Sequence, residues 1–544
     1  MEYTNIPKDK FRFADPNRRT GDKKFDTKPM SYAKDVFKRF CKNKSSVVAA
    51  IIIILLVLFS LITPLCYLNN RYTNSKDYND RLKYQFFLPK NPLFEGTGFW
   101  DGGKDYTGAK ENQYNIWQAL EQETGHNVIT KVDKGPYYEY DQYGNQVGSY
   151  ALYDVRVDTY TALGMTYLSL APEDYEALIK WQDKEGVQVI YPAVDTDAKR
   201  GSQYLILQAM KGDPNVWYET DRRGNPLVDE NGKLTPVYET TKTKPGYTLA
   251  NGYYYGFTDE NGEFVEGKRL ESDPGNYIYA VVEKVPTDTG VTYNYKVRVD
   301  KYALFEYTYG FEPYFLLGTN GRGDDMITKI AQGAQFSLVL AVCISAVNLF
   351  IGAIYGAIEG FYGGVTDLVM ERISDILGGI PTMVVMTLFQ LHLASKVGPV
   401  WSMVFAFILT GWLGMAARTR MQFYRFKRQE YVLSARTLGA SDSRLMFKHI
   451  FPNAMGTLIT GSVLSIPGVI FSESSLTYLG IVNLESSEAT SLGTLIAKGA
   501  ENYIDNPHVL FYPALFISLL EISFNLFGNG LRDAFNPSLK GIED

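Results

Sequence analysis

The chain has 544 residues, of which 45% are hydrophobic and 21% charged, and its formal net charge at pH 7 is -6. Two or more structural units are expected at this length, and the negative balance argues against a general nucleic-acid partner. The mean hydropathy of -0.16 is that of a polar protein, yet several windows are almost wholly apolar. A membrane domain joined to a large polar domain gives this average.

Cysteines and histidines give no sign of covalent or metal cross-links. The three cysteines lie in or beside apolar segments, and none falls between residues 67 and 342. That long region must therefore fold by packing, without internal disulfides. The four histidines are scattered, so neither a metal site nor a cofactor is expected.

The first apolar segment is predicted to be a transmembrane helix at 46–68, centred on 51–59. A helix of about 20 apolar residues crosses a bilayer, and this segment has a similar length. The segment before it is too long and too polar for the start of a signal peptide, so the anchor is expected to be retained. Lysines and arginines crowd the chain just before the span, which predicts a cytoplasmic N-terminal segment at 1–45.

Residues 69–315 are predicted to form an extracellular inserted domain of the α+β class, mostly β. Glycine stands beside asparagine between strand-like runs at Gly144, Gly224 and Gly262, which indicates hairpin turns. Residues 172–181 begin with proline and acids, as helices often do. The alternative, a solvated loop, is disfavoured by the many Tyr, Val and Ile residues.

Two stretches of this region echo each other in sequence. Residues 153–160 read Tyr-Asp-Val-Arg-Val-Asp-Thr-Tyr, and residues 295–302 read Tyr-Lys-Val-Arg-Val-Asp-Lys-Tyr. Each alternates as a half-buried strand does. The echo indicates either a duplicated β unit or a chance similarity between strands of a tyrosine-rich domain.

A membrane core with five further spans is predicted at 316–530, followed by a cytoplasmic C-terminal tail at 531–544. The spans are expected at about 336–355, 372–393, 400–417, 455–479 and 511–527. The fold class is therefore a polytopic α-helical membrane protein with six transmembrane helices. Six spans put both termini inside, and the strongly basic loop 418–454 then also lies inside.

Polar residues within the spans are candidates for a translocation pathway, because a polar group in lipid is costly and usually faces the bundle interior or water. The alternative is interhelical hydrogen bonding or a position at the headgroup level. Glycines along 352–364 are expected to allow close helix packing, with a flexible gate as the alternative. The pathway candidates are Gln390, His392, Glu473 and Asn348.

The loop 418–454 contains a short helix-turn-helix elbow between two apolar spans. Its residues near the turn are small, Gly439 permits a sharp backbone turn, and Pro452 ends the second helix or sets its angle. Such an elbow offers a lever to a soluble partner; the alternative is a basic loop held by lipid headgroups. The residues expected to contact such a partner are Ser434, Ala435, Arg436, Gly439, Ala440, Ser441, Asp442 and Pro452.

The elbow resembles the EAA loop of ABC importer permeases, which reads Glu-Ala-Ala, three residues, Gly, and Pro about a dozen residues later. Here Leu433, Ser434 and Ala435 stand at the leading positions, followed by Gly439 and Pro452. The glutamate is missing, and with it a contact that the family often makes to the ATPase.

The resemblance extends in order through 34–68 and 315–540, to the C-type permease subunits of oligopeptide and dipeptide importers. It is carried by Gly318-Thr-Asn320 and Asp325, by Glu473, and by 525–534 near the C-terminus. It implies a type I ABC importer permease fold. The chain departs from the family pattern at Asp324, Gln335 and Asn529.

The resemblance implies one permease subunit of an ATP-driven importer of oligopeptides or dipeptides in the cell membrane of a Gram-positive-type bacterium. Its partners would be a homologous second permease, two ATP-binding subunits, an extracellular lipid-anchored substrate-binding protein and membrane lipid. No Gly-Lys-Ser/Thr phosphate loop and no hydrolase motif occurs, so the chain is not expected to be an enzyme. The alternatives are a nickel, opine or glycan cargo, or a membrane-anchored surface receptor.

Overall fold

The structure is a computed structural model that describes most of the chain. The described residues are 32–67, 69–75, 81–191, 253–254, 256–258, 264–266, 268–269, 278–287, 290–482, 484 and 490–535. The ends of the N- and C-terminal segments and the predicted turn at Gly224 lie outside these residues.

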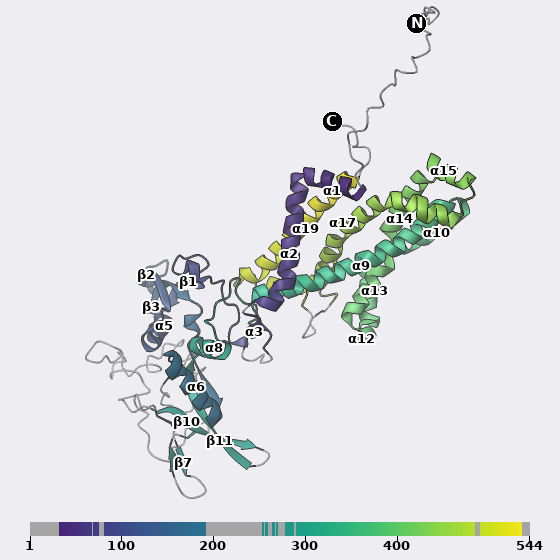
Figure 1. Cartoon of the computed structure of the whole chain (residues 1–544). Coiled ribbons are helices and arrows are strands. Elements are labelled where there is room, and N and C mark those ends of the chain that lie inside the picture. Colours follow the sequence, from purple (N-terminus) through teal and green to yellow (C-terminus); the bar gives the residue numbers. More distant parts are fainter. Residues whose placement is uncertain are drawn as a thin grey trace, which may run out of the picture.

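Long apolar helices form the membrane core (Figure 1). Within the described residues, five are long and apolar enough to cross a membrane, or six if one bent pair counts as a single span. This confirms the predicted class. The five are α2 (Lys44–Cys66), α9 (Met326–Tyr362), α13 with α14 (Pro399–Gly411 and Leu413–Phe426), the run Asp442–Tyr478 that ends in α17 (Phe451–Tyr478), and α19 (Pro507–Phe535).

The third predicted span, 372–393, is not one straight helix. Helices α10 (Gly364–Gly378) and α11 (Thr382–His392) meet at a bend of 70°. Gly379, Ile380 and Pro381 separate them. Proline lacks the N–H that would continue the helix and disfavours a helical conformation in the residue before it, so the break falls where the sequence places Pro381.

Helix α9 is the central element of the core, and its glycines bring α14 close. A Cβ atom on Gly352 would lie 2.7 Å from the carbonyl oxygen of Trp412, and one on Gly356 would lie 2.1 Å from that of Ala416. Gly360 approaches the Arg420 carbonyl in the same way, at 2.7 Å. The expectation of close helix packing is therefore confirmed for these three glycines.

Shorter elements complete the membrane part. Helix α1 precedes α2 and packs against α19 through an apolar cluster that contains Phe40 and Ala534. These shorter elements are α1 (Tyr32–Lys42), α12 (Ala394–Val397), α15 (Glu430–Thr437), α16 (Asp442–Arg444), the π-helical turn Leu445–Ile450 and α18 (Leu492–Glu501).

An α+β region is inserted between α2 and α9, as predicted. Its first sheet has the antiparallel order β1-β3-β2, and its second contains the path β4-β11-β10-β6. The strands of these paths are β1 (Gly103–Lys110), β2 (Ile129–Tyr140), β3 (Gln146–Asp158), β4 (Met165–Leu170), β6 (Tyr253–Tyr254), β10 (Ile278–Thr287) and β11 (Gly290–Asp300). The helices are α3 (Asn70–Thr73), α5 (Glu111–Thr124), α6 (Pro172–Glu185) and α8 (Lys301–Tyr309).

Short strands extend the second sheet or pair beside it. Strand β5 (Ile190–Tyr191) pairs with β11, and β9 (Lys268–Arg269) pairs with β10. Strands β7 (Gly256–Thr258) and β8 (Phe264–Glu266) pair antiparallel on either side of the predicted turn at Gly262, which itself lies outside the described residues. The turn at Gly144 joins β2 to β3, as predicted, with φ of 82° at the glycine.

The two sequence echoes occupy equivalent places in the two sheets. Along the chain the first sheet is built by β1, α5, β2 and β3, whereas in the second β4 and α6 are followed by the short strands β5 to β9 before β10 and β11. Strand β3 lies between β1 and β2, and β11 lies between β4 and β10. The two echo strands therefore share an inner position in their sheets.

An aromatic cluster joins the α+β region to the start of α9. Tyr72 and Phe305 are fully buried in it with Phe315. The Tyr72 hydroxyl donates to the Gly323 carbonyl at 2.6 Å, and the Asn69 amide donates to the Asp325 carboxylate at 3.0 Å. The α+β region lies at one end of α2, whereas α1 and α15 lie at the other end of the membrane helices (Figure 1).

Candidate functional site

The elbow is built by a helix cap at Gly439. This residue has φ of 83°, a left-handed conformation in which glycine is favoured. Its N–H donates to the Arg436 carbonyl at 3.0 Å, and the Ala440 N–H donates to the Ala435 carbonyl at 3.1 Å. These bonds end α15. The Ser441 side chain then accepts from the Arg444 N–H at 3.4 Å and begins α16.

One face of the elbow is anchored to the membrane core by buried apolar side chains. Phe361 at the end of α9 and Phe423 of α14 pack there with Val432 of α15 and Leu445 of the π-helical turn. Ala435 and Ala440 pack partly against the same cluster. The elbow is therefore in direct apolar contact with α9 and α14.

The opposite face of the elbow is exposed. Leu438 is 88% exposed and Leu433 is 48% exposed, and a Cβ atom on Gly439 would meet nothing within 4 Å. Other predicted residues of the elbow are also exposed: Ser434, Arg436, Ser441 and Asp442. A surface that combines apolar, small polar and charged groups is thus available to a partner.

Pro452 lies inside a continuous helical run and does not end it. The run extends over Asp442–Tyr478, and the π-helical turn Leu445–Ile450 comes just before the proline. In this wide turn the Phe451 N–H donates to the Met446 carbonyl. The extra residue in the turn gives room for a proline, which cannot donate to the preceding turn.

An ion-pair network lies beside the elbow, at the ends of α9, α10 and α14. Arg420 donates to Asp367 at 2.6 and 2.9 Å and to Glu371 at 2.8 and 3.0 Å. Glu359 of α9 lies 3.5 Å from the same guanidinium. The Tyr424 hydroxyl also donates to Asp367, at 2.8 Å. One arginine therefore ties three helices together where they meet the elbow.

Glu473, the buried pathway candidate, lies in a set of hydroxyl groups. It is 1% exposed and accepts from Ser337 of α9 at 3.1 Å and from Thr477 at 3.2 Å. Ser337 also accepts from the Leu492 N–H of α18, at 3.3 Å. These contacts join α17 to α9 through the Ser337 hydroxyl, and through Ser337 to the start of α18.

The other three pathway candidates lie apart from Glu473 on other elements. Asn348 of α9 is 9% exposed and sits against Gly411 of α13, where its side-chain oxygen has no hydrogen-bond partner. Gln390 of α11 donates to the Pro399 carbonyl at 3.0 Å, and His392 is exposed at the end of that helix. Within the described part of the chain, no hydrogen bond joins any two of the four.

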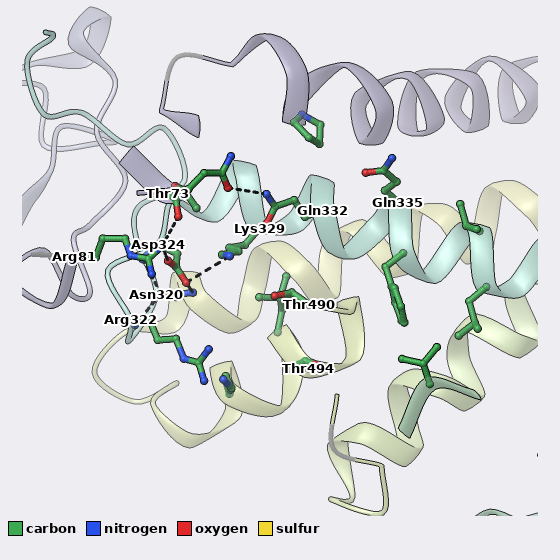
Figure 2. Close-up of a pocket in the computed structure, with 18 of the residues that line it drawn as sticks. Thr73, Arg81, Asn320, Arg322, Asp324, Lys329, Gln332, Gln335, Thr490 and Thr494 are labelled. Carbon is green, nitrogen blue, oxygen red and sulfur yellow. Dashed lines mark hydrogen bonds and ion pairs between the residues drawn. The ribbon is translucent and has the colours of Figure 1, made fainter. Parts of the chain in front are cut away.

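A cavity of about 1180 Å³ at the other end of the core was not predicted from the sequence. It lies between the start of α9, α13, α18 and the junction with the α+β region (Figure 2). Its cationic residues come from three separate segments of the chain, so no local motif reveals them. Asp324 and Gln335, two departures from the family pattern, both line it. The cations are Arg81, Arg322, Lys329 and Lys498.

A tight turn closes one wall of this cavity. The Gly323 N–H donates to the Asn320 carbonyl at 2.9 Å, and the glycine has φ of 75°. A Cβ atom there would lie 1.9 Å from the Arg81 carbonyl oxygen. Glycine is therefore required for the loop to approach the backbone of Arg81, which sets the position of the arginine.

Comparison with known proteins gives matches on both sides of most of the α+β region. Residues 349–541 match the family described as binding-protein-dependent transport system inner membrane component. Residues 31–89 match the N-terminal TM domain of oligopeptide transport permease C. These segments contain α2, the elbow and the last spans.

Curated relatives agree with these family matches. The oligopeptide transport system permease protein OppC of Bacillus subtilis is 40% identical over 223 residues, which are 41% of this chain and 72% of the relative. The dipeptide transport system permease protein DppC of the same species is 37% identical over 41% of this chain and 68% of the relative. DppC of Lactococcus lactis is 35% identical over 41% and 64%. The chain therefore belongs to the permease subunits of binding-protein-dependent ABC transport systems, in the C-type group of the oligopeptide and dipeptide transporters.

Proposed function

We propose that this multi-pass membrane protein forms half of the translocation pathway of an oligopeptide or dipeptide importer. The relatives named for oligopeptide and dipeptide transport support this cargo over nickel, an opine or a glycan. As a permease subunit of this family the chain has no ATPase activity of its own. Family membership also favours transport over the alternative of a surface receptor.

The complete importer would contain a second homologous permease, two ATP-binding subunits and an extracellular lipid-anchored binding protein. Dependence on a binding protein is part of the family description. The cell membrane would be of the Gram-positive type, with the binding protein held by a lipid; relatives occur in Bacillus and Lactococcus and also in Haemophilus influenzae. Alternating access would then arise as the two permeases rock against each other.

The elbow would be the contact with an ATP-binding subunit. The observation that carries this proposal is its two-sided construction: one face packs on Phe361 and Phe423, and the other exposes Leu438. Because Leu433 replaces the family's glutamate, the contact at that position would be apolar. Of the predicted coupling residues, Ser434, Arg436, Ser441 and Asp442 are exposed, Gly439 ends α15, and Ala435 and Ala440 pack against the buried cluster.

The topology would place both termini and the elbow in the cytoplasm and the α+β region outside. The basic loop around the elbow supports this orientation. So does the location of α1 and α15 at the end of the bundle opposite the α+β region (Figure 1). The domain boundaries at 69–315 and 316–530 remain part of this proposal.

The α+β region would help to dock the binding protein or the outer face of the second permease, without chemistry of its own. It emerges between α2 and α9, next to the cavity described above. Four tyrosines on the β2–β3 hairpin and its turn are 40–80% exposed, and tyrosines supply large contact areas at interfaces. The alternative is a spacer in the cell wall, and deletion of 72–312 distinguishes the two. If the region is a spacer, its deletion should leave the dependence of uptake on binding-protein concentration unchanged.

A single pair of substitutions tests the coupling function. Leu438→Asp is expected to lower ATP-driven uptake of a labelled tripeptide into proteoliposomes by about tenfold, because a charge replaces an apolar contact. Leu93→Asp is the matched control, since Leu93 has the same 88% exposure but lies in the α+β region. Equal uptake by both variants, with the whole complex assembled, would contradict the coupling role.

A further inference from the structure

A single residue separates α1 from α2 and changes the direction of the chain. Asn43 has φ of -86° and ψ of 98°, an extended conformation that interrupts the helix, and its side chain accepts from the Ser46 N–H at 3.4 Å to begin α2. Figure 1 shows α1 lying across the end of α2. Because α2 is a membrane span that begins at Lys44, α1 is held at the level of the membrane surface.

One side of α1 packs on the last helix of the core. Val36 and Phe40 are buried against α19, and the ring of Phe40 lies 5.3 Å from that of Phe527 between centroids. Asp35, the one acidic residue of α1, pairs with Arg39 at 2.7 Å. The negative charge of the helix is therefore matched within the helix itself.

The other side of α1 combines apolar and basic groups. Phe37 is 68% exposed, and Cys41, one turn later, is exposed beside it. Lys34 and Lys38 form the adjacent row, and both are exposed. Residues three or four apart lie on the same side of a helix, so these four side chains form one continuous surface, the α1 patch.

The adjoining span indicates what lies beside the α1 patch. Apolar side chains along one side of α2 are 43–59% exposed, as in a span that contacts acyl chains: Val48, Ile51, Leu55 and Leu58. An amphipathic helix at the membrane surface places its apolar side chains at the boundary between headgroups and acyl chains, and its lysines reach the phosphates. The α1 patch has both kinds of side chain in adjacent rows.

The charge of this corner of the chain favours anionic headgroups. Both charged side chains of the α1 patch are cations, and Lys44 is exposed at the start of α2. The segments 1–31, before α1, and 536–544, after α19, contain nine basic and seven acidic residues in sequence, so they do not reverse this balance. Each lysine close to a negatively charged membrane surface adds to the attraction.

We infer that the α1 patch binds anionic phospholipid. Phe37 and Cys41 would lie against the upper part of the acyl chains, and Lys34 and Lys38 would contact the phosphates. The leaflet is the cytoplasmic one in the proposed orientation, but the binding itself does not depend on the cargo or on the orientation. Because α1 packs on α19, the bound lipid would also hold the end of the last span at the membrane surface.

The test measures which lipid lies beside Cys41. Cys66 and Cys343 are replaced by serine, a fluorophore is attached to Cys41, and the complete importer, whose other subunits contain no reactive cysteine, is placed in nanodiscs. The probe is a nitroxide near the headgroup end of an acyl chain, carried either by phosphatidylglycerol or by phosphatidylcholine at equal mole fraction in otherwise identical bilayers. The ratio of the two quenching efficiencies reports enrichment of the anionic lipid at the α1 patch.

Three double variants identify the lysines that are responsible. Lys34→Gln with Lys38→Gln removes both charges of the α1 patch, and Lys34→Arg with Lys38→Arg keeps them. Lys180→Gln with Lys184→Gln is the matched control, because it removes two exposed lysines one turn apart on α6, in the α+β region.

We expect the wild type to show a ratio of about two or more at low salt, which falls toward one in about 1 M salt because salt screens the attraction. The glutamine variant of the α1 patch should give a ratio near one at low salt, and the arginine and α6 variants should retain the wild-type ratio. A ratio of one in the wild type, or an unchanged ratio in the glutamine variant, would overturn the inference. Quenching by aqueous iodide with none from either lipid probe would also overturn it, because the α1 patch would then face water or a soluble subunit. Peptide uptake is measured separately, so none of these outcomes alters the proposed transport.

Discussion

A single methyl group at Gly356 tests whether the close contact between α9 and α14 determines the stability of the membrane core. In Gly356→Ala the new Cβ would lie 2.1 Å from the Ala416 carbonyl oxygen and 2.8 Å from Cβ of Thr419. An ordinary carbon–oxygen contact is about 3.3 Å or longer, so the two backbones must separate by about 1 Å. The obstructing oxygen belongs to the backbone, and no change of rotamer relieves the contact.

The matched control is Gly414→Ala, because Gly414 lies in α14 and a Cβ there meets nothing within 4 Å. Replacing glycine by alanine within a helix stabilises it by about 1 kcal/mol at either position. Overpacking at Gly356 should cost about 1–3 kcal/mol in addition. The free energy of unfolding of Gly356→Ala is therefore expected to be lower than that of Gly414→Ala by about 1–3 kcal/mol.

Thermal unfolding of the two purified variants in the same detergent measures this difference. Gly356→Ala should unfold at the lower temperature, and both should elute as single species on size exclusion. Equal unfolding temperatures, or a more stable Gly356→Ala, would refute the claim that the glycines are needed for contact between α9 and α14.

Three further predictions concern the ion pairs and the α+β region. Arg420→Gln leaves Asp367 and Glu371 without their charged partner and should reduce the free energy of unfolding by about 1–3 kcal/mol. Arg420→Lys should recover only part of this loss. An unchanged unfolding temperature in Arg420→Gln would contradict the prediction. Burial raises the pKa of Asp325 from 3.8 to about 6, so the stability it contributes is full below pH 3.8 and is lost as the pH rises through about 6. Asp325→Asn keeps a side chain that can cap α9 but does not titrate, so it should not show this loss of up to about 3 kcal/mol. Thermal unfolding of both proteins near pH 4.5 and pH 7.5 tests this, and the stability of the variant relative to wild type should be greater at pH 7.5 than at pH 4.5. A soluble fragment 69–325 should unfold cooperatively with or without reductant. It should also unfold at a higher temperature than 69–315, because only the longer fragment keeps the hydrogen bond of 2.6 Å from the Thr319 hydroxyl to the Tyr84 carbonyl. A random-coil spectrum would show that the region does not fold alone.

Most of the membrane fold was predictable because apolar length and charge bias act locally along the chain. The spans at α2, α9, α13–α14, α17 and α19 follow from this pattern, as does the α+β class of the insert. The break at Pro381 was present in the sequence as Gly-Gly-Ile-Pro, but the apolar run across it gave the stronger signal.

The site residues show where sequence reasoning stops. The turn at Gly439 was predictable, because the glycine is favoured there by the local backbone conformation and not by contacts with distant segments. The hydroxyl groups around Glu473 come from α9 and from the residues beside it on α17, and sequence alone does not assign the face of a helix. The cavity brings together Arg81, Arg322 and Lys498 from three distant segments, which only the folded chain places together.

The most direct test of the account is a cross-link from the elbow to an ATP-binding subunit. The chain would first have its three exposed cysteines replaced by serine, and then carry Leu438→Cys or, as a control, Leu93→Cys. In membranes that contain the assembled importer, a short thiol-to-amine cross-linker should join Leu438→Cys, and not Leu93→Cys, to the ATP-binding subunit. Cross-linking of that subunit through Leu93→Cys, or none through Leu438→Cys in an intact complex that hydrolyses ATP, would contradict the account.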